Sequence, residues 1–103
     1  MSMTKTEMVA KLKEMLEDTQ GGVQNEDIWA KGSSGEEMKM HQLNKRGLEI
    51  RAELLELIIN VLEEKETVLA GHFEDAVCNI LNEEELADSE YVEMFKELKE
   101  QYC

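Results

Sequence analysis

No proline interrupts this chain of 103 residues, and its apolar residues recur at intervals of three and four positions. Both features favour helices, because proline removes a helical hydrogen bond and a period near 3.6 residues puts apolar side chains on one helix face. Hydrophobic residues make up 42% of the chain, which is enough to form one compact core. We therefore expect a single all-α domain over residues 1–103, folded as a small antiparallel helical bundle of about four helices.

The first helix is expected to begin at a capping box, Thr4-x-x-Glu7, in which the hydroxyl and the carboxylate each satisfy a backbone donor. Gly21-Gly22 is expected to end this helix, because glycine is common just after a helix C-terminus. Residues 20–35 are then predicted to form a loop with at most a single helical turn in its middle, since Gly and Ser are frequent at its two ends.

A second capping box, Ser34-x-x-Glu37, begins the longest helix of the expected bundle, its central helix. The apolar arc of this helix is widest from Leu54 to Leu62. A wide arc needs cover on more than one side. We expect it at the centre of the core or, alternatively, in the interface of a structural or regulatory helical homodimer.

The polar run at residues 63–67 is the expected break after the central helix. Apolar pairs then recur every four residues from Val68 to Leu81. This period runs straight through Gly71, which favours a helix that contains the glycine. The alternative is that Gly71 caps the preceding helix and that the next helix begins at about Phe73.

Acidic residues are concentrated in the second half of the chain. The whole chain has 24 Asp and Glu against 11 Lys and Arg, a net charge of −13, and residues 48–103 hold 16 of the acids and 4 of the bases. The density is highest around the last helix, which is expected to follow an N-cap at Asp88-Ser89. We predict a docking surface for a basic partner here. Its residues are Glu83, Glu84, Glu85, Asp88, Glu90, Glu93, Glu97 and Glu100.

Ile28 and Trp29 are large apolar residues inside the expected loop. Large apolar side chains normally find cover, so we expect the two to fold back as a lid over the helices. The alternative is that they anchor a partner, because Trp is enriched at binding hot spots. We therefore add Ile28 and Trp29 to the predicted partner-binding residues.

The net charge of −13 argues against direct binding to nucleic acid or to anionic membranes, and it favours a basic protein surface as partner. A helix that carries acids every three or four residues places a carboxylate about every 5 Å, in a row that can stand in for phosphates. In acidity, size and helical composition the chain resembles small phage proteins that inhibit restriction or CRISPR nucleases by mimicking nucleic acid. The resemblance implies a non-enzymatic inhibitor that blocks a basic nucleic-acid-binding surface.

Two carboxylate pairs, Glu53-x-x-Glu56 and Glu85-x-x-Asp88, have a spacing that suits Mg²⁺ on a helix face. In these four residues the chain resembles the all-α nucleotide pyrophosphohydrolases of the MazG and dimeric dUTPase type, which implies a Mg-dependent hydrolase as a further alternative. The chain departs from that pattern because Asp88 falls at an expected helix start and Lys and Arg are not placed to bind phosphates. With 24 acids such spacings arise by chance, so we expect a solvated face, with no catalytic residue, metal or cofactor.

The two cysteines, Cys78 and Cys103, are too few for a disulfide scaffold and suit a reducing compartment. No apolar run approaches the ~20 residues that a membrane span needs. We therefore expect a cytoplasmic protein.

Overall fold

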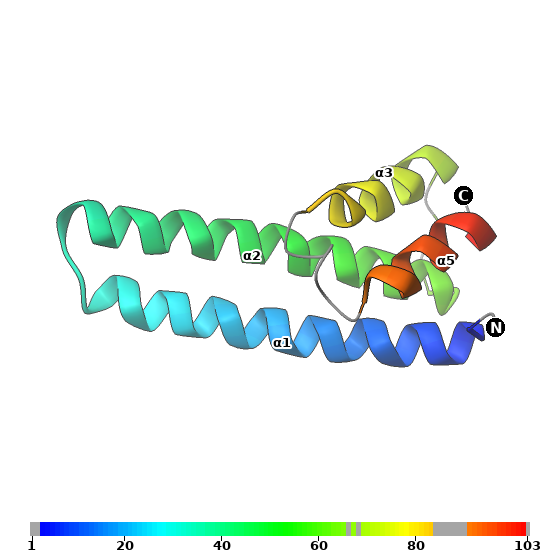
Figure 1. Cartoon of the computed structure of the whole chain (residues 1–103), viewed down its shortest axis with the longest axis horizontal. Coiled ribbons are helices and arrows are strands. Elements are labelled where there is room, and N and C mark those ends of the chain that lie inside the picture. The colour runs from blue at the N-terminus through cyan, green and yellow to red at the C-terminus, as the bar shows by residue number, and fades with distance from the viewer. Residues whose placement is uncertain (1–2, 66, 68, 84–90, 103) are drawn as a thin grey trace.

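The computed structural model describes residues 3–65, 67, 69–83 and 91–102, and within these ranges all of the regular secondary structure is helical (Figure 1). The helices are α1 (Lys5–Lys31), α2 (Gly35–Leu62), α3 (Ala70–Leu81) and α5 (Val92–Tyr102). Helices α1 and α2 form a long antiparallel hairpin, and α3 and α5 pack near its open end (Figure 1). The expected all-α bundle is thereby confirmed.

The hydrophobic core lies where the two short helices meet the hairpin. Four residues of the α2 apolar arc are buried there, Leu55, Ile58, Ile59 and Leu62. The arc therefore lies at the centre of the core, which was the first of the two places predicted for it. The face that sequence analysis offered to a homodimer is therefore occupied by the chain itself. The other core residues are Met8, Leu12, Met15, Phe73, Ala76, Val77, Ile80, Tyr91, Met94, Phe95 and Leu98.

The predicted loop over residues 20–35 is wrong, and the first helix does not end at Gly21-Gly22. Helix α1 continues for 27 residues to Lys31, and only residues 32–34 connect it to α2. The bundle consequently has two long helices in place of one central helix. Each internal glycine costs about 1 kcal/mol relative to alanine, and packing against α2 offsets that cost. At Gly22 the glycine also aids packing, because a Cβ atom there would lie 3.2 Å from Cδ1 of Leu48.

The two predicted capping boxes have different outcomes. The first is confirmed: the Thr4 hydroxyl accepts a hydrogen bond from the Glu7 backbone N–H, and the Glu7 carboxylate accepts one from the Thr4 backbone N–H. At the second, α2 does begin after Ser34, but the Ser34 side chain makes no capping hydrogen bond. Gly35 has a φ of +64°, which turns the chain between Ser34 and the regular helix.

The break between α2 and α3 falls at the polar run over residues 63–67, and Gly71 lies inside α3, as the favoured alternative predicted. Helix α2 ends in a Schellman motif, in which the Lys65 N–H bonds to the Asn60 carbonyl and the Glu64 N–H bonds to the Val61 carbonyl. This motif requires a left-handed residue, and Glu64 supplies it with a φ of 61°. A position that usually holds glycine is thus occupied by glutamate. The predicted N-cap at Asp88-Ser89 lies outside the described residues.

Gly21→Ala is expected to raise the free energy of unfolding by about 0.5–1 kcal/mol, because alanine favours a helix interior and nothing lies within 4 Å of the added Cβ atom. Gly22→Ala is the matched control and should gain less, since Leu48 must move to accept the methyl group. Urea unfolding followed by circular dichroism measures both. An unchanged stability for Gly21→Ala would contradict a helix at residues 20–31.

Glu64→Gly is expected to be more stable than Glu64→Ala by about 1 kcal/mol, because only glycine adopts the left-handed conformation without steric cost. Both variants remove the 3.8 Å ion pair between Lys5 and Glu64, so their difference isolates the backbone contribution. Thermal melts at neutral pH measure it. Equal melting temperatures would show that the left-handed turn carries no strain.

Candidate functional site

Two of the predicted docking acids make contacts within the chain. Glu83, just after α3, forms an ion pair with Arg51 of α2, whose Nε lies 2.8 Å from the carboxylate. Glu97 of α5 accepts a hydrogen bond of 3.0 Å from the Met3 backbone N–H. These carboxylates tie the end of α3 to α2 and the start of the chain to α5. Their first role is therefore to hold the bundle together.

Two other predicted acids, Glu93 and Glu100, are exposed on α5. The Glu93 carboxylate lies 3.8 Å from Nζ of Lys96 on the surface of the same helix, and such exposed pairs contribute little to stability. The remaining predicted residues, Glu84, Glu85, Asp88 and Glu90, lie outside the described residues.

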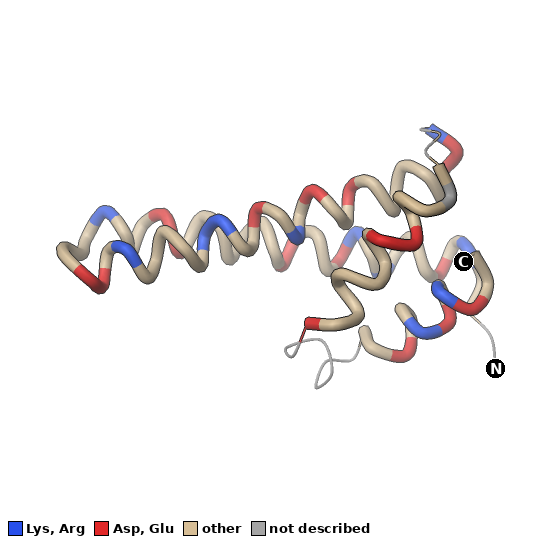
Figure 2. The backbone as a smooth tube through the Cα atoms, turned by 90° about the horizontal axis from the view of Figure 1, so that it is seen from above, with Lys and Arg blue, Asp and Glu red and all other residues tan. Residues whose placement is uncertain are grey.

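The net charge of the molecule is concentrated at one of its two ends. We call residues 20–50, the closed end of the α1–α2 hairpin, the arm, and the rest of the chain the body. The arm has 5 acidic and 4 basic residues, so the body carries nearly all of the net charge of −13. Figure 2 shows Lys and Arg interspersed with Asp and Glu along the arm, whereas α3 carries acids alone. The negative field of the molecule is therefore strongest around the body.

Ile28 and Trp29 lie on α1 within the arm, and the prediction that they form a lid is wrong. Ile28 is 65% exposed and Trp29 is 52% exposed. Helix α5 packs at the other end of the hairpin, so the structure does not bring this pair together with the acids of α5 (Figure 1). The single docking surface predicted from the sequence is thus divided between two ends of the molecule.

Sequence analysis missed the exposure of three further apolar residues of the arm, Met40, Leu43 and Ile50 on α2. Met40 and Leu43 occur at helical spacing before Gly47, Leu54 and Ile58, so one stripe of α2 runs from the arm into the body. In the body this stripe is covered, and Ile58 is fully buried. The regular spacing of this stripe was readable from the sequence. Which of its residues are exposed depends on how far α3 extends along α2.

Polar side chains hold the two helices of the arm together. His41 Nδ1 of α2 lies 2.6 Å from a carboxylate oxygen of Glu26 on α1, and the His41 ring lies 5.7 Å from the ring of Trp29. Lys45 Nζ donates a 2.9 Å hydrogen bond to Asp27. This bond lowers the pKa of the Asp27 carboxyl and raises the pKa of Lys45 from their ordinary values. The cluster gives the arm a polar seam where the body has an apolar core.

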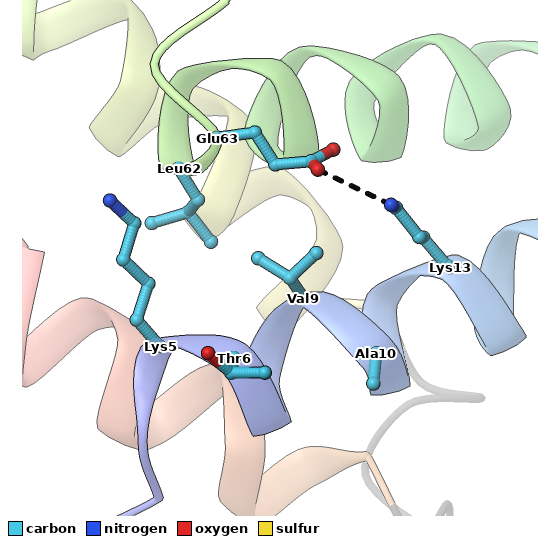
Figure 3. Close-up of a pocket in the computed structure, with 7 residues that line it drawn as sticks. All are labelled: Lys5, Thr6, Val9, Ala10, Lys13, Leu62 and Glu63. Atoms are coloured by element: carbon cyan, nitrogen blue, oxygen red, sulfur yellow. Dashed lines mark hydrogen bonds and ion pairs between the residues drawn. The ribbon is translucent and has the colours of Figure 1, made fainter.

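A groove of about 480 Å³ lies between the start of α1 and the end of α2 (Figure 3). Val9 and Leu62 form its apolar floor, and Lys13 donates a 3.3 Å hydrogen bond to Glu63 across it. The lysine lowers the pKa of the Glu63 carboxyl from its ordinary value. This ion pair joins the two long helices at the open end of the hairpin, and we assign it to the fold.

Glu53 and Glu56, the first of the two carboxylate pairs, are exposed on α2. Among the described residues, no three His, Cys, Asp or Glu side chains come together as a metal site. The second pair, Glu85 and Asp88, lies outside those residues, so the Mg-dependent alternative stays a prediction. No helix in the described ranges is both long and apolar enough to cross a membrane.

Comparisons of the chain with protein-family models, with curated proteins and with solved structures found no match.

Asp27→Asn is expected to lower the melting temperature at pH 7 and to have no effect below the folded-state pKa of Asp27. The pKa of this carboxyl is lowered in the folded protein, so its contribution is complete above the unfolded pKa and is lost as the pH falls through the folded one. Melts of wild type and variant at pH 7 and at about pH 2.5 measure the difference.

Lys45→Met tests the partner of Asp27. At pH 7, Lys45→Met should lower the melting temperature less in the Asp27→Asn background than it does in wild type. The reason is that Asp27→Asn already removes the main hydrogen bond. Fully additive effects, or an Asp27→Asn effect that is the same at both pH values, would argue against this bond as the source of the stabilisation.

Proposed function

We propose that this protein acts without catalysis, by protein–protein binding, and that its acidic body docks on a basic surface of its partner. The observation that carries the proposal is the division of charge, with a balanced arm and a body that holds nearly all of the net −13. A concentrated negative field of this kind accelerates encounter with a basic surface and aligns the partner before contact.

The partner surface that fits best is one that normally binds nucleic acid. Such surfaces are rich in Lys and Arg that contact phosphates, and a carboxylate can accept hydrogen bonds from the same side chains. In the described part of the body, α3 packs beside α5 and both carry exposed acids. We propose that this protein is an inhibitor of a nucleic-acid-binding enzyme, the function to which its resemblance to small acidic phage inhibitors points.

Within this proposal the predicted acids have different roles. Glu93 and Glu100 are exposed on α5, so we propose that they contact the partner directly. Glu83 is held by Arg51, and Glu97 is held by the Met3 backbone. In this proposal they add to the negative field of the body more than they contact the partner. Glu84, Glu85, Asp88 and Glu90 stay as docking residues on the strength of the sequence. Ile28 and Trp29 take no part in this surface, because they lie on the arm.

The double variant Glu93→Lys/Glu100→Lys tests the proposal. The assay measures displacement of a fluorescent DNA duplex from a panel of purified restriction and CRISPR nucleases by added protein, at low and at moderate salt. We expect wild type to displace DNA from at least one enzyme, less well as salt rises. The variant should be weaker by about tenfold or more, because each reversal replaces an attraction with a repulsion.

The matched control is Glu53→Lys/Glu56→Lys. It changes the net charge by the same amount, also at two exposed glutamates of one helix, but on α2. A docking surface at α5 predicts a much smaller loss for the control than for the α5 variant. Equal losses would show that only total charge matters, and no displacement of DNA from any enzyme would exclude this class of partner.

A further inference from the structure

We propose that the arm binds the arm of a second copy of this chain, so that two hairpins pair antiparallel and form a four-helix bundle. The two copies meet at the exposed face of the arm that holds Trp29, Met40 and Leu43. We call this surface the arm face. The inference stands independently of the proposed function, because it concerns the end of the molecule that carries almost no net charge.

The first observation is that the described residues cover the hairpin at one end and not at the other. In the body, α3 and α5 pack on the hairpin (Figure 1). Beyond them the α2 stripe continues as Gly47, Leu43 and Met40, with Leu43 74% exposed and Met40 52% exposed. A pair of helices buries its apolar residues only when a further layer packs on it. A second arm would supply such a layer over the width of two helices.

The second observation is Gly47. It lies inside α2, where glycine costs about 1 kcal/mol relative to alanine. Gly22 has a reason within the chain, since Leu48 packs against it, but among the described residues nothing lies within 4 Å of the Cβ position at Gly47, as at Gly21 and Gly71. Close approach of another helix along the arm face gives this glycine the role that the single chain does not.

The third observation is charge. A molecule with a net charge of −13 repels its own copies, and almost all of that charge is on the body. The arm has 5 acids and 4 bases and can approach another arm at little electrostatic cost. Antiparallel pairing also places the two acidic bodies at opposite ends of the dimer. The principal extents of one chain, 46 × 27 × 20 Å, make that separation large compared with a Debye length of ~8 Å.

Antiparallel pairing brings the tip of one arm to the base of the other. Trp29 is near the tip, and at the base lies a cavity of about 370 Å³ whose lining includes Leu43, Gly47, Leu48 and Arg51. The indole of the second copy fits against the apolar side of this cavity, which Leu43 and Leu48 form beside the Arg51–Glu83 ion pair. The register of the two arms is thereby set by Trp29 in each copy.

The size of the arm face limits the strength of the dimer. About 13 helical residues span ~20 Å, and two helices side by side are also ~20 Å wide. Two such faces bury about 800 Å² in total, which is below the ~1,200 Å² of stable specific interfaces and in the range of weak, transient ones. We therefore expect a dissociation constant in the micromolar range, and a monomer–dimer equilibrium that responds to concentration.

Sedimentation velocity from about 1 µM to about 500 µM tests the proposal with wild type and two variants. Leu43→Glu introduces a charge at the centre of the arm face and should be monomeric throughout. Ile28→Glu is the matched control, since Ile28 is similarly exposed at 65% on the arm but does not belong to the arm face; it should dimerise like wild type. Circular dichroism checks that both variants fold.

Gly47→Gln is a second probe, because it favours the helix while blocking close approach. It should melt at or above the wild-type temperature and should dimerise at least about tenfold more weakly. Trp29 is the only Trp in the chain, so its emission should shift to the blue as wild type dimerises, and it should not shift in Leu43→Glu. Salt should leave the dimer nearly unchanged, because the two bodies already lie more than a Debye length apart, whereas it weakens binding to a basic partner.

A wild type that stays monomeric at the highest concentration overturns the proposal. So does a Leu43→Glu variant that dimerises like wild type, or an Ile28→Glu variant that dissociates as fully as Leu43→Glu. None of these outcomes affects the DNA-displacement assay, which measures the acidic body, so the two proposals fail separately.

Discussion

The packing of α1 against α2 is the interaction on which the rest of the structure depends. Met8 and Leu12 of α1 and Leu55 and Ile58 of α2 are fully buried in one cluster, and α3 and α5 complete that cluster. Truncation of such a residue to alanine typically costs 2–5 kcal/mol, a large part of the stability of a small domain. Because the apolar packing is confined to the open end of the hairpin, the closed end extends as an arm held by the polar pairs Glu26–His41 and Asp27–Lys45.

This arrangement separates two physical properties that a compact bundle would mix. The body buries the apolar residues and carries the acids, while the arm is balanced in charge and exposes Trp29, Met40 and Leu43. The negative field of the body favours basic surfaces, and the arm face favours an apolar surface of low net charge. The two proposals therefore use different ends of one molecule and respond differently to salt, since screening weakens attraction between opposite charges but has little effect on bodies that lie more than a Debye length apart.

Local patterns predicted the elements with short-range causes. The Thr4–Glu7 capping box and the break at residues 63–67 depend on neighbours within a few residues, and both were readable. The wide apolar arc from Leu54 to Leu62 was readable as well, although its cover comes from other helices. Gly21-Gly22 was misread as a helix end because its cost is local, whereas the packing that offsets it comes from Leu48, 26 positions after Gly22. Of the predicted site, Glu93 and Glu100 are exposed, but the contacts of Glu83 and Glu97 with distant partners had no sequence signal.

The sequence by itself determined that the chain is helical, where its acids are concentrated and which stripes are apolar, because these properties follow from residue type and spacing. Only the tertiary structure decided which apolar stripe is covered and which acids are engaged. Met40 and Leu43 lie on the same stripe of α2 as Leu54 and Ile58. They are nevertheless exposed, because α3 and α5 are too short to cover the whole hairpin. Burial depends on what lies opposite a residue in space, and the linear pattern does not contain that information.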